Sequence, residues 1–215
     1  METKEKLQQS YINYVLTHGE QPKSVFIFAK ENDMAEEEFY NHFGSFESIE
    51  LAIWKALMAS TLSEVKAQEV WPQYTSREKA LSLFYSFIEM LKSKRSFASF
   101  SLKNAPKTIG TKRVLEGLKL EFDFFAAEII QEGIESGELI DRPFFANKYK
   151  DALWYQFTFV LNFWFKDTSA GFDKTDEAIE KGVNVTYNLF QRSPIDELFE
   201  YGKFLAKNSG IKMPF

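Results

Sequence analysis

Apolar residues recur every three or four positions along most of the chain, and strict alternation of apolar and polar residues is scarce. This period is typical of amphipathic α-helices rather than strands. The pattern predicts a first helix that ends near Gly19, two short helices, and then a series of longer ones. The expected ranges of these later helices are 25–31, 35–42, 46–68, 76–94, 96–104, 111–136, 144–166, 173–191 and 194–207. We therefore predict an all-α fold.

The composition agrees with this prediction and indicates the cellular compartment in which the protein is expected. The 215 residues include only 10 Gly and 6 Pro, which favours helices over a turn-rich β fold. The chain has no Cys, so disulfides and thiolate metal sites are excluded, and a reducing cytoplasm is expected. The charged N-terminus does not resemble a secretory signal. The most apolar run, Ala152–Phe165, is too short to span a bilayer.

A chain of 215 residues is long enough for one mid-sized domain or for a small domain plus a larger one, and we expect two parts. A small N-terminal domain of three helices covers residues 1–46, and a larger helical domain covers residues 47–215. We call them the head and the body. Because a long predicted helix begins near Phe46, at their boundary, no flexible linker is expected between them.

Two short helices in the head, Ser24–Glu31 and Ala35–His42, have the dimensions of a helix-turn-helix. Segment Ser24–Ile49 resembles the head of the tetracycline-repressor (TetR) family. Its Phe39-Tyr40-Asn41-His42-Phe43 is similar to the family's recognition-helix end, Phe/Leu-Tyr-x-His-Phe, and Ile129–Leu139 resembles a Gly-x-x-x-Gly-Glu phrase that ends a body helix in many members.

The resemblance implies a regulator that binds a DNA operator through the head. The second helix of such a unit lies in the major groove while other groups hold phosphates. The candidate DNA-binding residues are Ser24, Glu36, Glu37, Tyr40, Asn41 and His42. Tyr40 and His42 are equally interpretable as packing and capping residues, and Ser24 as the N-cap of its helix.

The charge of the head departs from that expectation. Residues 1–50 hold 4 Lys+Arg against 10 Asp+Glu, a net charge of −6. DNA affinity comes largely from Lys and Arg at phosphates. At three consecutive positions the family usually has a small or basic residue, then Gly, then Thr, and this chain has Glu36-Glu37-Glu38 there. The Lys that often binds a phosphate in the family is Phe46 in this chain. The three glutamates also suit a helix N-terminus, whose dipole favours negative charge.

The body is rich in aromatic residues, which either form an ordinary core or line a pocket for a hydrophobic small molecule or lipid. TetR-like bodies commonly enclose an apolar effector. The candidate ligand-binding residues are Phe84, Phe87, Phe100, Phe122, Phe125, Trp154 and Phe157. Candidate polar anchors on the same helices are Tyr85, Tyr155, Gln156 and Asn162.

Two further features of the body suggest that its surface contacts a ligand or a second subunit. The segment Lys92–Arg113 carries seven Lys+Arg and no acid, so it either receives an anionic group or forms a solvated face. Trp154–Phe165 and Val183–Phe190 present more apolar surface than one body needs. A homodimer through the last two long helices, as the resemblance implies, would bury it.

No catalytic constellation is recognised. The two histidines, His18 and His42, lack a convincing partner set, and the sequence has no metal-binding or phosphate-loop motif. We expect no enzyme activity, metal or cofactor. The leading hypothesis is a homodimeric, ligand-responsive DNA-binding regulator. The alternative is a TetR-fold protein that binds lipids or other hydrophobic ligands and has lost DNA binding.

Overall fold

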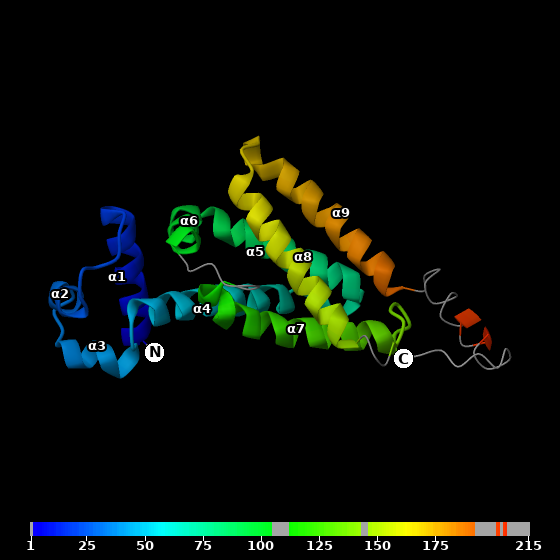
Figure 1. The fold of residues 1–215 in the computed structure, drawn as a ribbon, viewed down its shortest axis with the longest axis horizontal. Coiled ribbons are helices and arrows are strands. Elements are labelled where there is room, and N and C mark those ends of the chain that lie inside the picture. The colour runs from blue at the N-terminus through cyan, green and yellow to red at the C-terminus, as the bar shows by residue number, and fades with distance from the viewer. Residues whose placement is uncertain (1, 105–111, 143–145, 192–200, 203, 206–215) are drawn as a thin grey trace.

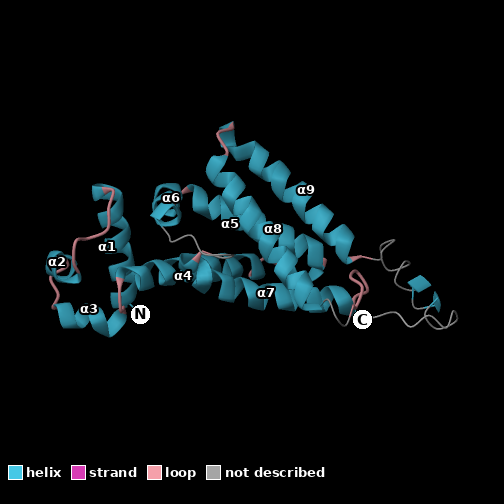
Figure 2. Cartoon of the chain, in the orientation of Figure 1, coloured by secondary structure: helices cyan, strands magenta, loops and turns pink. Residues whose placement is uncertain are grey.

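The computed structural model describes residues 2–104, 112–142, 146–191, 201–202 and 204–205, and all its longer elements are helices (Figures 1 and 2). The predicted all-α fold is confirmed. The helices are α1 (Glu2–His18), α2 (Val25–Glu31), α3 (Glu36–His42), α4 (Phe46–Lys66), α5 (Ser76–Lys92), α6 (Arg95–Asn104), α7 (Glu116–Glu135), α8 (Ala146–Lys166) and α9 (Asp173–Phe190).

Most predicted helix ranges agree with these bounds to within a few residues. The helix expected from residue 111 instead begins with a short 3-10 turn, Arg113–Leu115, followed by α7. Residues 105–111 lie outside the described part. The last expected helix, 194–207, also falls largely on residues that the structure does not describe.

The head consists of α1, α2 and α3 at one end of the molecule, left in Figure 1. Its centre is a set of aromatic rings. Phe28 is buried and lies edge-on to Tyr11, Phe39 and Phe46, with ring centroids 6.3, 6.1 and 5.5 Å away. Because Phe46 is the first residue of α4, this cluster also attaches the head to the helix that enters the body.

Helix α4 connects the two parts and packs along α7. A Cβ atom at Gly117 would lie 2.8 Å from the backbone oxygen of Leu51, so only glycine allows this approach of the two helices. Lys55 and Glu121 add an ion pair across the contact, with Nζ and Oε1 3.4 Å apart.

Helices α8 and α9 lie side by side and cover α5 and α7 (Figure 1). Gly182 on α9 faces the amide of Gln156 on α8, and a Cβ atom at position 182 would lie 1.8 Å from Nε2, so a larger residue there would require the Gln156 side chain to move. The turn between them is capped by Asp167, whose Oδ2 accepts hydrogen bonds from the backbone and hydroxyl of Thr175 at 2.9 and 2.7 Å.

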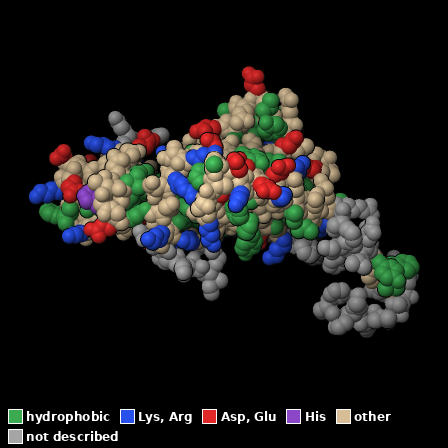
Figure 3. All heavy atoms as spheres, turned by 90° about the horizontal axis from the view of Figure 1, so that it is seen from above, with side chains coloured by type: hydrophobic (Ala, Val, Ile, Leu, Met, Phe, Trp, Pro, Cys, Tyr) green, Lys and Arg blue, Asp and Glu red, His purple; other side chains and the backbone are tan. Residues whose placement is uncertain are grey.

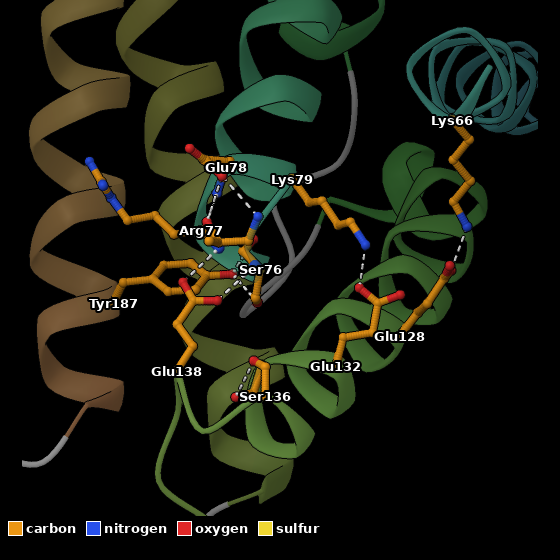
Figure 4. A network of polar contacts seen from close by, with 12 residues as sticks. Lys66, Ser76, Arg77, Glu78, Lys79, Glu128, Glu132, Ser136, Glu138 and Tyr187 are labelled. Atoms are coloured by element: carbon orange, nitrogen blue, oxygen red, sulfur yellow. Dashed lines mark hydrogen bonds and ion pairs between the residues drawn. The ribbon is translucent and has the colours of Figure 1, made fainter. Parts of the chain in front are cut away.

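A polar network holds the end of the body that lies away from the head (Figure 4). The carboxylate of Glu138 accepts from the backbone N–H groups of Ser76 and Arg77, at 2.8 and 3.1 Å, and so caps the N-terminus of α5. The hydroxyl of Tyr187 on α9 donates to the backbone oxygen of Ser76 at 2.9 Å. Lys79 pairs with Glu132 on α7 at 2.5 Å. The ends of α5, α7 and α9 are thereby joined.

Candidate functional site

The residues predicted to contact DNA lie on or beside α2 and α3. Ser24 caps α2, since its Oγ accepts from the backbone N–H of Ile27 at 3.2 Å, as its N-cap interpretation requires. Tyr40 is 52% exposed, Glu36, Glu37 and Asn41 are exposed, and His42 is half-buried. Five of these six side chains therefore lie on α3, the short helix that the sequence predicts to be the recognition helix.

The surface around these residues is acidic. Glu36, Glu37 and Glu38 occupy the first turn of α3, whose N-cap, Ala35, makes no side-chain hydrogen bond. These three carboxylates have no cationic partner among the described residues. An open hollow of about 420 Å³ beside them is lined by Phe26, Lys30, Asp33, Met34, Ala35 and Glu36. Figure 3 shows charged and hydrophobic side chains mixed over the head.

The aromatic residues predicted to line a ligand site form a packed cluster. Phe122 is fully buried, and its ring centroid lies 6.3 Å from that of Phe84, 5.3 Å from Trp154 and 5.0 Å from Phe157. Phe87 and Phe125 join at the edges of the cluster. Phe100, on α6, is half-buried and packs against the core. The structure thus brings together side chains from α5, α7 and α8, and their rings fill the space between these helices.

A small pocket lies beside this cluster, between α6 and α8. Its volume is about 100 Å³. Typical ligand sites measure about 300–1,000 Å³, so a larger ligand would require side chains or α6 to move. Among the predicted aromatic residues Trp154 lines it, and so do two predicted polar anchors, Tyr155 and Asn162. The other lining residues are Leu102, Lys112, Leu115, Thr158 and Leu161.

Sequence reasoning did not identify those five lining residues. Lys112 stands in the basic stretch and its ammonium donates to the backbone oxygen of Leu102. The approach of α6 to α8 creates the pocket, and no local pattern encodes that approach. Of the other predicted anchors, Tyr85 is exposed and donates to the backbone oxygen of Asp176 at 3.3 Å, while Gln156 faces α9.

The basic stretch Lys92–Arg113 is mostly engaged within the protein. Lys92 pairs with Glu89 at 2.6 Å, and Arg113 with Glu47 at 3.3 Å. The guanidinium of Arg95 lies 4.4 Å from the ring centroids of both Trp164 and Phe172, and donates to backbone oxygens at the end of α8. Lys107 lies outside the described residues. The contacted cations thus stabilise the protein itself, a role that neither the anionic-group nor the solvated-face interpretation anticipated.

The outer face of α8 and α9 exposes apolar side chains. Many residues of the two runs predicted to pair are buried within the body itself, including Phe157, Trp164 and Tyr187. Four large side chains remain more than half exposed: Tyr155 at 66%, Phe159 at 57%, Val185 at 61% and Leu189 at 57%. The apolar surface offered to a partner is thus smaller than the sequence suggested, and it is shared by both helices.

The described residues include no helix with the length and apolarity that crossing a membrane requires. They also contain no cluster of three or more His, Asp or Glu side chains placed to hold a metal ion.

The fold is similar to those of several solved structures. FadR from Bacillus subtilis in complex with stearoyl-CoA aligns with a TM-score of 0.60 and 17% identity, over 82% of this chain and 96% of that one. FadR from Bacillus halodurans, a fatty acid degradation regulator, aligns with a TM-score of 0.58 and 16% identity, over 86% and 94%. A candidate TetR family transcription regulator from Shewanella sp. PV-4 aligns with a TM-score of 0.60 and 13% identity, over 88% and 98%.

No curated protein matches the chain. A family model does match it and agrees with this fold. Residues 79–205, more than half of the chain, match the family described as "Tetracyclin repressor-like, C-terminal domain". The segment runs from the first turn of α5 through α9, and these helices carry the aromatic cluster and the outer apolar face. The chain belongs to the tetracycline-repressor-like family, whose fold is that of ligand-responsive transcription regulators.

Proposed function

We propose that the protein is a ligand-responsive, DNA-binding transcription regulator that acts as a homodimer. The observation that carries the proposal is the two-part fold, in which a three-helix head with an exposed α3 is joined through α4 to a body of the tetracycline-repressor-like family. In a helix-turn-helix dimer the two heads bind half-sites about one helical turn of DNA apart. A ligand in the body would change the spacing of the heads.

The proposed ligand is a hydrophobic small molecule or lipid, and the proposed entrance is the pocket between α6 and α8. Leu102, Leu115 and Leu161 give this pocket apolar walls, and the ammonium of Lys112 is beside it. An apolar chain with an anionic group fits this combination of surfaces. Because one solved structure of this fold holds stearoyl-CoA, a long-chain acyl-CoA is the first probe to use. Its chain requires the pocket to widen into the aromatic cluster.

The ligand proposal is tested by native mass spectrometry and calorimetry with stearoyl-CoA and stearate. We expect binding at one site per chain, and a loss of affinity for the Thr158→Trp variant, which fills the pocket. Tyr85→Trp, on the exposed side of α5, is the matched control. If neither probe binds the wild-type protein, this ligand class is wrong.

The proposed dimer interface is the outer face of α8 and α9. A symmetric contact would bury Tyr155, Phe159, Val185 and Leu189 of both subunits. Analytical ultracentrifugation is expected to give a dimer for the wild-type protein and a monomer for Phe159→Lys with Leu189→Lys. Phe124→Lys, at a 68% exposed position on α7, is expected to remain dimeric. A monomeric wild-type protein would refute this interface.

DNA binding is tested with duplex DNA from upstream of the protein's own gene, titrated at several salt concentrations. A regulator is expected to bind at low salt, with an affinity that falls as salt rises because phosphate counterions are released. A folded dimer that retards no duplex at low salt would contradict the proposal.

The second candidate function is hydrophobic-ligand binding without DNA binding. The acidic surface of the head favours it, because the exposed carboxylates of Glu36, Glu37 and Glu38 lie where a duplex would bring phosphates. The same two assays separate the candidates. Ligand binding together with no affinity for duplex DNA would select the second.

A further inference from the structure

A buried carboxylate lies where the head meets the body. Glu50, in the second turn of α4, is only 5% exposed. It stands between Tyr11 on α1, in the head, and Ser101 on α6, in the body, and both of these residues are completely buried. The three residues come from segments far apart in the sequence, and α1 and α6 are in contact in the fold.

Three donors share this carboxylate. The hydroxyl of Tyr11 donates to Oε1 of Glu50 at 2.6 Å, and the amide of Gln21, which follows α1, donates to the same oxygen at 3.1 Å. The hydroxyl of Ser101 donates to Oε2 at 2.5 Å and accepts from Nε1 of Trp54 at 3.0 Å. Burial and the neighbouring carboxylate raise the pKa of Tyr11, so its hydroxyl stays protonated and remains a donor.

These hydrogen bonds make the positions of the head and of α6 depend on one another. A buried carboxylate is costly unless its oxygens are hydrogen-bonded. The described residues place no cation within ion-pair distance of Glu50, so the neutral donors hold it. If Ser101 withdraws, Oε2 loses the donor that α6 provides, and the arrangement that also holds Tyr11 and Gln21 becomes less favourable. Networks in which every group is satisfied specify one arrangement in this way.

The same segment of α6 forms the wall of the pocket. Leu102 lines the pocket, and its backbone oxygen accepts from the ammonium of Lys112, another lining residue. Ser101 is its neighbour in sequence and points to Glu50 instead. A ligand that widens the 100 Å³ pocket by pushing α6 therefore acts on a helix whose adjacent side chain is attached to the head.

We propose that Glu50 is a positioning residue that couples α6, and the pocket wall it carries, to the orientation of the head. While Ser101 donates to the carboxylate, the head keeps one orientation relative to the body. When α6 moves and this hydrogen bond is lost, the head can change its orientation. Its use in regulation rests on the proposed function, but the coupling is a property of the folded chain and can be measured without ligand or DNA.

Hydrogen exchange of the full chain, followed by mass spectrometry, tests the coupling in both directions. Ser101→Ala removes a hydroxyl from the body, and we expect amides of α1 in the head to exchange at least about fivefold faster. Tyr11→Phe removes a hydroxyl from the head and keeps the ring, and we expect faster exchange in α6. Coupling between two sites is reciprocal, so both effects are required.

Two controls separate coupling from general destabilisation. Ser99→Ala removes an exposed hydroxyl from α6, and Thr61→Val removes a buried hydroxyl of α4 that donates to its own helix at Leu57. Neither variant is expected to speed hydrogen exchange in α1 beyond any change at the ends of α5, α7 and α9. Exchange at those ends reports opening of the whole body.

The outcome can overturn the proposal without affecting the proposed function. If Ser101→Ala accelerates only α6, or if Tyr11→Phe accelerates only the head, Glu50 is a local structural residue and the coupling is wrong. If both long-range effects occur but the protein binds neither ligand nor DNA, the coupling stands and the proposed function fails.

Discussion

The head and the body are each built around interlocking aromatic rings, but they differ in how they use charged side chains. In the head, Phe28 and Phe39 are buried while the carboxylates of Glu36 to Glu38 face solvent without cationic partners among the described residues. In the body, charges join helices, as in the pairs Lys55–Glu121 and Lys79–Glu132. The core therefore specifies the shape of the head without dictating the charge of its surface.

The largest expected effect tests whether cores rather than surfaces specify both parts. Phe39→Ala in the head and Phe122→Ala in the body each remove a fully buried ring, and each should lower the free energy of unfolding by about 3–5 kcal/mol. Their exposed neighbours provide matched controls, since Tyr40→Ala and Phe124→Ala should change it by less than about 0.5 kcal/mol. Urea denaturation measures all four. An equal loss for Tyr40→Ala and Phe39→Ala would show that the surface of the head matters as much as its core.

A smaller effect is expected when the charge of the head is reversed. Changing Glu36, Glu37 and Glu38 to Lys should raise the affinity for non-specific duplex DNA at low salt by about tenfold or more, because each lysine that reaches a phosphate releases counterions. The affinity is measured by fluorescence anisotropy over a series of salt concentrations.

The control for this reversal changes three exposed acids of the body, Glu64, Glu69 and Glu135, to Lys. Both triple variants have the same net charge. If they gain affinity equally, net charge alone explains the gain and the position of α3 is irrelevant. If only the head variant gains, the shape of the head suits a duplex and its charge opposes binding.

The smallest expected effect compares one helix cap in each part. Ser24→Ala in the head and Thr75→Ala in the body each remove an N-cap hydroxyl that accepts from a backbone N–H at 3.2 Å. Each variant should lower the free energy of unfolding by about 1 kcal/mol. The loss should be larger for Thr75→Ala, because the Thr75 hydroxyl also donates to the carboxylate of Glu78 at 3.0 Å. Thermal unfolding measures the difference. A larger loss at Ser24 would contradict this order.

The sequence was a good guide to helices because their signals are local. The three-to-four period, the Ser24 cap and the break at Gly19 all act within a turn or two, and α2 has the predicted bounds. The family's head motif likewise lies within one short segment. The domain boundary at residues 46 and 47 stays a prediction, and α4 passes through it as one continuous helix.

The candidate sites were harder to predict because they depend on distances between helices. The sequence shows many aromatic residues, but whether they surround a cavity or fill one depends on packing between α5, α7 and α8. Glu50 lies in an apolar stretch and gave no sign that its partners would be Tyr11 and Ser101. The basic stretch looked like a binding surface because Glu47 and Trp164, which engage Arg113 and Arg95, are distant in sequence.

The contact between Gly182 and Gln156 has an evolutionary consequence. Since a Cβ atom at position 182 would collide with the amide of residue 156, a substitution at 182 requires a change in the side chain at 156. Relatives that carry alanine or serine at 182 should carry a shorter residue at 156, turn its side chain away, or hold α8 and α9 farther apart. Positions in contact covary for this reason. An alignment of relatives would therefore record the spacing of the two helices as a correlated pair of substitutions.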